Sequence, residues 1–138
     1  MPSLELSFGL ILKAKLDFKE TDTRRNKYFV ILGEDPKAKD VLFFLTTSQI
    51  EKIPSTPIYQ SNVIHIRPGE VSCFKLPTAI DCRTVHTRQK SWFQNKVSKS
   101  LLGFHGTLPS EFQDQIKQII FNSPFISQYH RGIIWGKS

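Results

Sequence analysis

The sequence predicts a small, mainly β domain with α additions, in which antiparallel strands form a barrel or sandwich and the chain ends in a helix. Short runs of β-branched and aromatic residues, separated by turn residues, fill the first two-thirds of the 138-residue chain, as in such β folds. In the last third, apolar residues recur at the period of an α-helix. The length and the apolar content of 39% fit a single folded domain over residues 1–138.

Strand patterns open the chain. Residues 4–16 alternate apolar and polar side chains, as a half-buried strand does, and the polar segment 17–26 is expected to be a loop. Residues 28–32 and 41–45 are apolar runs typical of buried central strands. Because turn-forming residues lie between them at 33–37, we expect the two runs to form a hairpin.

Weaker patterns follow the hairpin. Residues 63–67 alternate again, and two short extended pieces are expected at 74–76 and 78–80, on either side of Pro77. The polar, basic stretch 91–106 is expected to be a connection without regular structure.

One helix is predicted near the C-terminus. Pro109 and a capping box of Ser110 and Gln113 predict where it starts. Its apolar face consists of Phe112, Ile116, Ile119 and Ile120. Residues 122–124 end it, and residues 125–126 begin a final short element.

The charge indicates a polyanionic partner. The formal net charge is +7, which favours nucleic acid or an acidic protein segment over a merely soluble basic protein. Residues 82–110 contain no Asp or Glu. Their cations are Arg83, Arg88, Lys90, Lys96 and Lys99. In this stretch Trp92 either stacks on a base or, like Phe93, belongs to the core.

Other classes of protein are disfavoured. No apolar run approaches the ~20 residues of a membrane span. The first residues lack the basic start and cleavage site of a secretory signal, so a cytoplasmic location is expected. Cys73 and Cys82 are expected to be reduced and buried. The four histidines lie far apart, so we expect no metal site.

Two segments carry side chains that could meet a phosphate. Arg24, Arg25 and Lys27 stand at the entry to a buried strand, where Lys27 is held best, although they could also be solvated loop charges. Thr46–Ser48 places hydroxyls where another strand ends. Such hydroxyls donate to a phosphate or cap local backbone groups.

A third segment pairs opposite charges. Asp81 and Arg83 are two residues apart on an extended chain, so both side chains lie on one face and can form an ion pair. No glycine-rich phosphate loop, serine-nucleophile motif or cofactor fingerprint occurs in the chain.

In order and spacing, these segments resemble the MazF/PemK-type toxin family of bacterial toxin–antitoxin pairs. The resemblance spans residues 6–121, and its motifs are NKYFVIL at 26–32, FLTTSQ at 44–49, AIDCR at 79–83 and GTLPSEF at 106–112. It implies a small SH3-like antiparallel barrel with a C-terminal helix, forming a homodimer held in check by an acidic antitoxin protein. The implied activity is metal-independent, sequence-preferring cleavage of single-stranded RNA through attack of the 2′-hydroxyl, without a cofactor.

Carried over by position, the resemblance assigns catalysis to Lys27 and Thr46. We expect further RNA contacts from Arg24, Arg25, Thr47, Asp81, Arg83, Lys96 and Lys99. Lys27 stands where the family has arginine, and a lysine lacks the planar fork that grips a phosphate with two hydrogen bonds. Tyr28 replaces the family's proline. The alternative is a non-catalytic barrel that binds nucleic acid or a protein partner, and a weaker one is a DNA-binding accessory protein.

Overall fold

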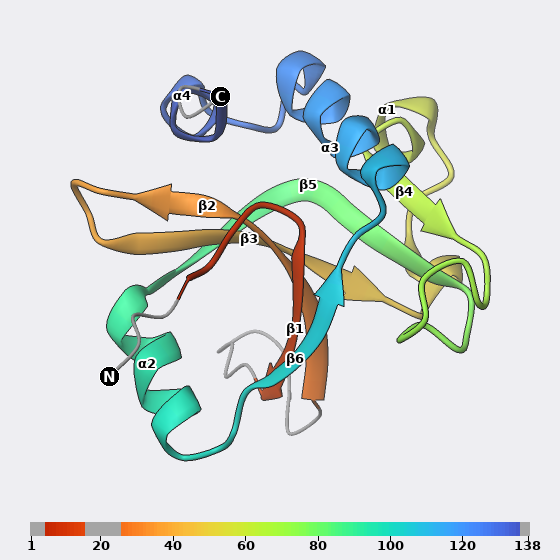
Figure 1. Cartoon of the computed structure of the whole chain (residues 1–138). Coiled ribbons are helices and arrows are strands. Elements are labelled where there is room, and N and C mark those ends of the chain that lie inside the picture. The colour runs from red at the N-terminus through yellow and green to blue at the C-terminus, as the bar shows by residue number, and fades with distance from the viewer. Residues whose placement is uncertain (1–4, 16–25, 136–138) are drawn as a thin grey trace.

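The computed structural model describes residues 5–15 and 26–135, and its centre is a six-stranded antiparallel sheet that curls into a half-barrel (Figure 1). The strands are β1 (Leu10–Lys15), β2 (Asn26–Asp35), β3 (Asp40–Thr47), β4 (Val63–Ile66), β5 (Thr78–Gln89) and β6 (Gly103–Thr107). Their order across the sheet is β4-β5-β3-β2-β1-β6. The predicted fold class, an antiparallel barrel-like sheet with a C-terminal helix, is confirmed.

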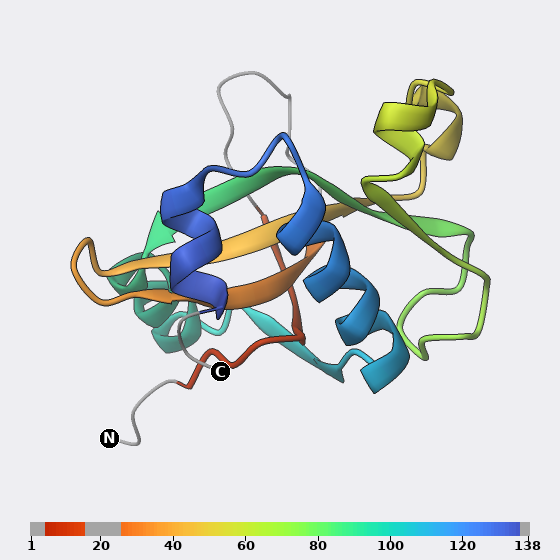
Figure 2. The ribbon, with the colours of Figure 1, turned by 90° about the horizontal axis from the view of Figure 1, so that it is seen from above.

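Helices lie on both sides of the sheet. In the described residues they are a 3-10 turn (Ile50–Lys52), α1 (Pro57–Gln60), α2 (Lys90–Ser98), α3 (Ser110–Asn122) and α4 (Gln128–Trp135). Helices α3 and α4 cover one face, and α2 lies on the opposite side (Figures 1 and 2). No described helix has the length and apolarity needed to span a membrane.

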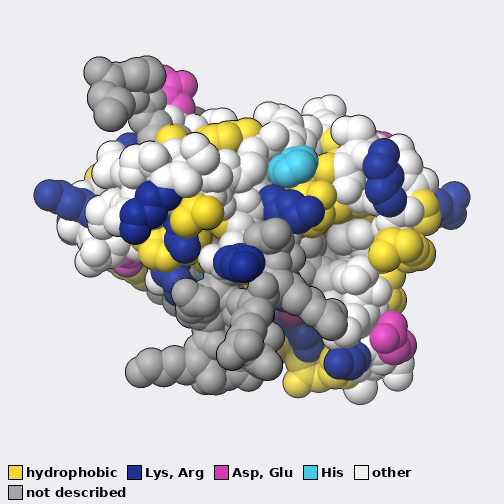
Figure 3. All heavy atoms as spheres, turned by 90° about the horizontal axis from the view of Figure 1, so that it is seen from below, with side chains coloured by type: hydrophobic (Ala, Val, Ile, Leu, Met, Phe, Trp, Pro, Cys, Tyr) yellow, Lys and Arg dark blue, Asp and Glu magenta, His cyan; other side chains and the backbone are white. Residues whose placement is uncertain are grey.

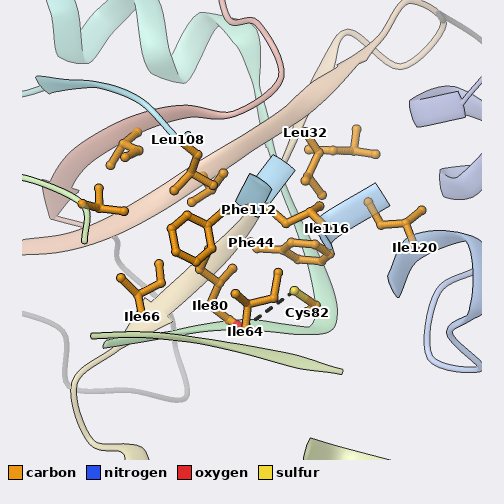
Figure 4. Close-up of a cluster of buried hydrophobic side chains, with 14 of the residues drawn as sticks. Leu32, Phe44, Ile64, Ile66, Ile80, Cys82, Leu108, Phe112, Ile116 and Ile120 are labelled. Atoms are coloured by element: carbon orange, nitrogen blue, oxygen red, sulfur yellow. Dashed lines mark hydrogen bonds between the residues drawn. The ribbon is translucent and has the colours of Figure 1, made fainter. Parts of the chain in front are cut away.

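The middle segments of β2 and β3 are apolar on both faces, and both of these faces are buried. In β2, Val30 and Leu32 belong to the cluster beneath α3, whereas Phe29 and Ile31 pack in a second cluster with Phe93 of α2. Successive side chains of a strand point to opposite faces, so the continuous run at 28–32 fills two cores. The cluster beneath α3 includes Leu32, Phe44, Ile64, Ile80, Phe112, Ile116 and Ile120 (Figure 4).

The first strand is shorter than predicted. We expected one strand over residues 4–16, but β1 begins only at Leu10. Gly9 has a φ of 87°, a conformation that breaks the extended chain. Its N–H donates to the carbonyl of Ile31 at 2.8 Å, and its carbonyl accepts from the N–H of Leu108 at 2.8 Å, so this kink joins β2 to the segment before α3.

The expectation of an irregular connection over 91–106 is wrong. Residues 90–98 form α2, which buries Phe93, and Gly103–Thr107 form β6, which pairs with β1. Strand β5 also extends much further than the expected piece at 78–80. It continues to Gln89 because the first residues of β3 pair with its second half, across an irregular register near Phe44.

The predicted capping box is also wrong, although the helix itself is confirmed. The residue that caps α3 is Pro109, without a side-chain hydrogen bond. The Gln113 side-chain amide instead donates to the carbonyl of Leu108 at 2.7 Å. This hydrogen bond therefore links the first turn of α3 to the residue that follows β6.

Candidate functional site

Strands β6, β1, β2 and β3 bring one residue each into a row across the sheet. Lys13 lies opposite Gly103 on one side and opposite Tyr28 on the other. The Thr46 hydroxyl donates to the carbonyl of Tyr28 at 3.1 Å. Residues directly opposite each other in antiparallel strands project to the same face, so the row collects groups that are far apart in the sequence.

A hollow of about 360 Å³ opens at this row, where β1, β2 and β3 meet the loop that precedes β5. Lys13, Lys27 and Lys75 bring positive charge to its lining, and Thr46 and Thr47 bring hydroxyls. None of its described lining residues is acidic. Two sequence-predicted catalytic residues, Lys27 and Thr46, thus line one basic hollow with Thr47.

Lys13 is the cation that the sheet directs over the hollow. Its Nζ lies 4.8 Å from the centre of the Tyr28 ring. Lys27 pairs with Ala14 in the register, and the alternation of β2 sends its side chain to the face opposite Tyr28. Lys27 therefore contributes to the rim of the hollow, and Lys13 supplies the charge beside the aromatic ring.

The two threonines differ in what their hydroxyls can do. Thr46 is buried, and its hydroxyl hydrogen is engaged with the backbone of Tyr28. The Thr47 oxygen accepts from the N–H of Gln49 at 3.0 Å, which leaves its hydrogen for another acceptor. Thr47 is thus better suited than Thr46 to donate to a phosphate.

Tyr28 organises the aromatic side of the hollow. Its ring meets Phe74 edge-on at 5.2 Å between ring centres, and it meets His105 edge-on at 5.1 Å. Cys73, which also lines the hollow, is a free thiol whose pKa is raised by burial. The thiol therefore stays protonated at neutral pH.

A second hollow, of about 430 Å³, adjoins the first through Lys13. Lys15, Lys96 and Gly103 are among its other lining residues. The Lys96 ammonium lies 5.2 Å from the centre of the Trp92 ring, which itself packs against the core. We call the two hollows together the basic groove. On the side of the molecule that carries α2 and β6, Lys and Arg side chains dominate over acidic ones (Figure 3).

Among the other cations expected to contact RNA, Lys99 is exposed just after α2 and does not line either hollow. Arg24 and Arg25 lie outside the described residues.

Asp81 and Arg83 do not line the groove. They form an ion pair with two hydrogen bonds of 2.8 Å, as their spacing predicted. Arg83 also stacks on Tyr59, at 5.2 Å from the ring centre, and Tyr59 stacks in parallel on Phe125. Burial raises the pKa of Asp81, but the hydrogen bonds and charge of Arg83 outweigh it and hold the pKa below its usual value.

Sequence reasoning missed Lys13, Lys15, Lys75 and His105. Lys13 and Lys15 are two residues apart in a strand, so their shared face was readable from the sequence. The neighbourhood of His105 and Tyr28 depends on β6 pairing with β1, and no local pattern reports that pairing.

The described residues contain no group of three or more His, Cys, Asp or Glu side chains able to hold a metal ion. Comparisons with protein-family models and with curated proteins found no match.

Proposed function

We propose that the chain is an endoribonuclease of the MazF/PemK type, which cleaves single-stranded RNA in the basic groove without a metal ion. The observation that carries the proposal is the convergence of Lys13, Lys27 and Thr47 on one hollow with no acidic residue in its described lining. Polyanionic RNA suits such a groove. Its 2′-hydroxyl supplies the nucleophile.

In this reaction the 2′-oxygen attacks the adjacent phosphorus and the 5′-oxygen leaves. Negative charge builds up on the phosphate oxygens in the transition state. Lys13 stabilises that charge, Lys27 adds positive potential from the rim, and the Thr47 hydroxyl donates to one of the oxygens. Charged and hydrogen-bonding groups fixed in advance contribute strongly to such reactions, at roughly 10²–10³-fold for each donor removed.

The second hollow would hold the neighbouring nucleotides. Lys15 and Lys96 line it, and each can pair with one backbone phosphate. The proposed partners beyond RNA are an acidic antitoxin segment, which would compete for the same lysines, and a second copy of the chain in a homodimer. Such a system would work in the cytoplasm, where its RNA substrate is.

A non-catalytic nucleic-acid-binding barrel is the second candidate. It is favoured by one observation: the hydroxyl hydrogen of Thr46 is engaged with the Tyr28 carbonyl, so Thr46 is committed to the fold. In that case the lysines would hold the phosphate backbone and no bond would break.

The test is to incubate the purified chain with a long single-stranded RNA in EDTA and to map the ends. We expect discrete cuts with 2′,3′-cyclic phosphate and 5′-hydroxyl ends, and a loss of roughly 100-fold in rate for Lys13→Ala. The matched control is Lys37→Ala, which removes an exposed lysine in the β2–β3 turn. RNA that is bound but stays intact would overturn the proposal in favour of the binding module.

A further inference from the structure

The proposed reaction needs a group that accepts a proton, and the lining of the first hollow, over the residues that the structure describes, contains neither a carboxylate nor an imidazole. Its described polar side chains are lysines, hydroxyls, a phenol, one amide and a thiol whose pKa burial has raised. Asp81 is paired with Arg83 outside the groove. Since imidazole is the side chain that exchanges protons near neutral pH, the histidines are the groups to consider.

Three of the histidines lie elsewhere. The His65 ring is 2.9 Å from the side-chain oxygen of Gln60, beside α1. The His86 ring stacks on Phe43, within the cluster packed against α2. His130 belongs to α4, on the face that α3 and α4 cover.

His105 is not part of the lining of either hollow, but it contacts residues that line both. It is half-buried in β6 and touches Tyr28, which lines the first hollow. Gly103, which lines the second hollow, is also close to the ring. A Cβ placed on Gly103 would lie 3.1 Å from Nε2 of His105. The imidazole therefore lies back across Gly103, and the missing side chain there leaves it room.

The same two neighbours, Tyr28 and Gly103, are the register partners of Lys13. Lys13 also lines both hollows. Tyr28 from β2 contacts the His105 ring, and the ammonium of Lys13 from β1 lies over that same tyrosine. A phosphate held by Lys13 would lie next to the imidazole.

We propose that His105 is the proton-transfer residue of this groove, an inference that rests on the proposed ribonuclease function. Its imidazole takes the proton of the 2′-hydroxyl while the 2′-oxygen–phosphorus bond forms. It returns that proton to the 5′-oxygen as the bond from phosphorus to that oxygen breaks. The products are a 2′,3′-cyclic phosphate and a 5′-hydroxyl, and no further reactant is consumed.

The experiment compares single-turnover cleavage rates between pH 5 and pH 9 for the full chain, His105→Ala, His105→Gln and the control His65→Gln. Positioned proton transfer contributes roughly 10²–10⁴-fold. We therefore expect both His105 variants to lose at least about 100-fold in rate and to lose the rate's dependence on an imidazole ionisation. Affinity for an oligonucleotide with 2′-deoxy linkages, which cannot be cleaved, should stay within about twofold of wild type.

Gly103→Ala provides a second variant that keeps the histidine. It should displace the ring and lower the single-turnover rate at saturating RNA while leaving the circular dichroism spectrum unchanged. If the wild-type chain cleaves and the His105 variants cleave equally well with the same pH profile, this assignment is wrong and the ribonuclease proposal stands. If the wild-type chain does not cleave RNA, the ribonuclease proposal and the assignment of His105 are both wrong.

Discussion

The basic groove and the Asp81–Arg83 pair are two polar regions of one sheet, and they differ in how their cations are used. In the groove, three lysines line a hollow that contains no acidic residue among its described lining. At the other region, Arg83 is neutralised by Asp81 through two hydrogen bonds and is covered by Tyr59. Cations without a neighbouring carboxylate attract an external anion, whereas a satisfied ion pair supports the fold.

We expect the largest effect on stability when the ion pair between Asp81 and Arg83 is broken. Asp81→Ala leaves Arg83 without its carboxylate at a partly buried position, and we expect it to lower the free energy of unfolding by about 1–2 kcal/mol. RNA cleavage should be unchanged at temperatures where the variant is folded. Urea unfolding followed by circular dichroism gives the first value, and the RNA assay gives the second.

Lys13→Ala should show the opposite pattern, with cleavage lost and the unfolding midpoint retained. A variant of either region that damaged both properties equally would show that the two regions are not functionally separate.

The ion pair also predicts a pH dependence of stability. The pKa of Asp81 is lowered in the folded state by Arg83, so its contribution is present above the unfolded value of about 4. That contribution is lost as the pH falls through the lower, folded value. Wild type should therefore lose stability on acidification below about pH 4 more steeply than Asp81→Asn.

The control for this comparison is Asp114→Asn, which changes an exposed carboxylate on α3. The measurement is the unfolding midpoint of wild type and of both variants from pH 2.5 to pH 6. Parallel curves for wild type and Asp81→Asn would contradict the assigned role of Arg83.

The smallest expected effect is a difference in the salt dependence of RNA affinity between variants of two lysines near the end of α2. Lys96 lines the second hollow and Lys99 does not. Each phosphate contact on single-stranded nucleic acid contributes about 0.7 to the slope of log affinity against log salt. Lys96→Ala should lower that slope by about 0.7, and Lys99→Ala should leave it nearly unchanged. Fluorescence anisotropy from 50 to 300 mM salt measures both, and equal slopes would exclude the second hollow from the RNA path.

The parts predicted well from the sequence are those with strong local patterns. The buried runs at 28–32 and 41–45 lie in β2 and β3, and the apolar period of residues 112–120 corresponds to α3. The spacing of Asp81 and Arg83 also sufficed to predict their pairing.

Helix α2 was missed because Phe93 is its only buried residue, so no apolar stripe marks it. The groove was predicted in part, because Lys27, Thr46 and Thr47 line it at strand ends. Lys13, Lys75 and His105 come from three other segments, and only the pairing of β1 with β2 and β6 brings Lys13 and His105 to Tyr28.

The most direct test of the account is to map where RNA binds. Backbone amide NMR shifts would be followed while a single-stranded oligonucleotide with non-cleavable 2′-deoxy linkages is added. We predict that the largest changes fall on Lys13, Tyr28 and Gly103, with little change at Arg83 and Tyr59. Changes centred on Arg83 and Tyr59, with the groove silent, would contradict the claim that the basic groove is the functional site.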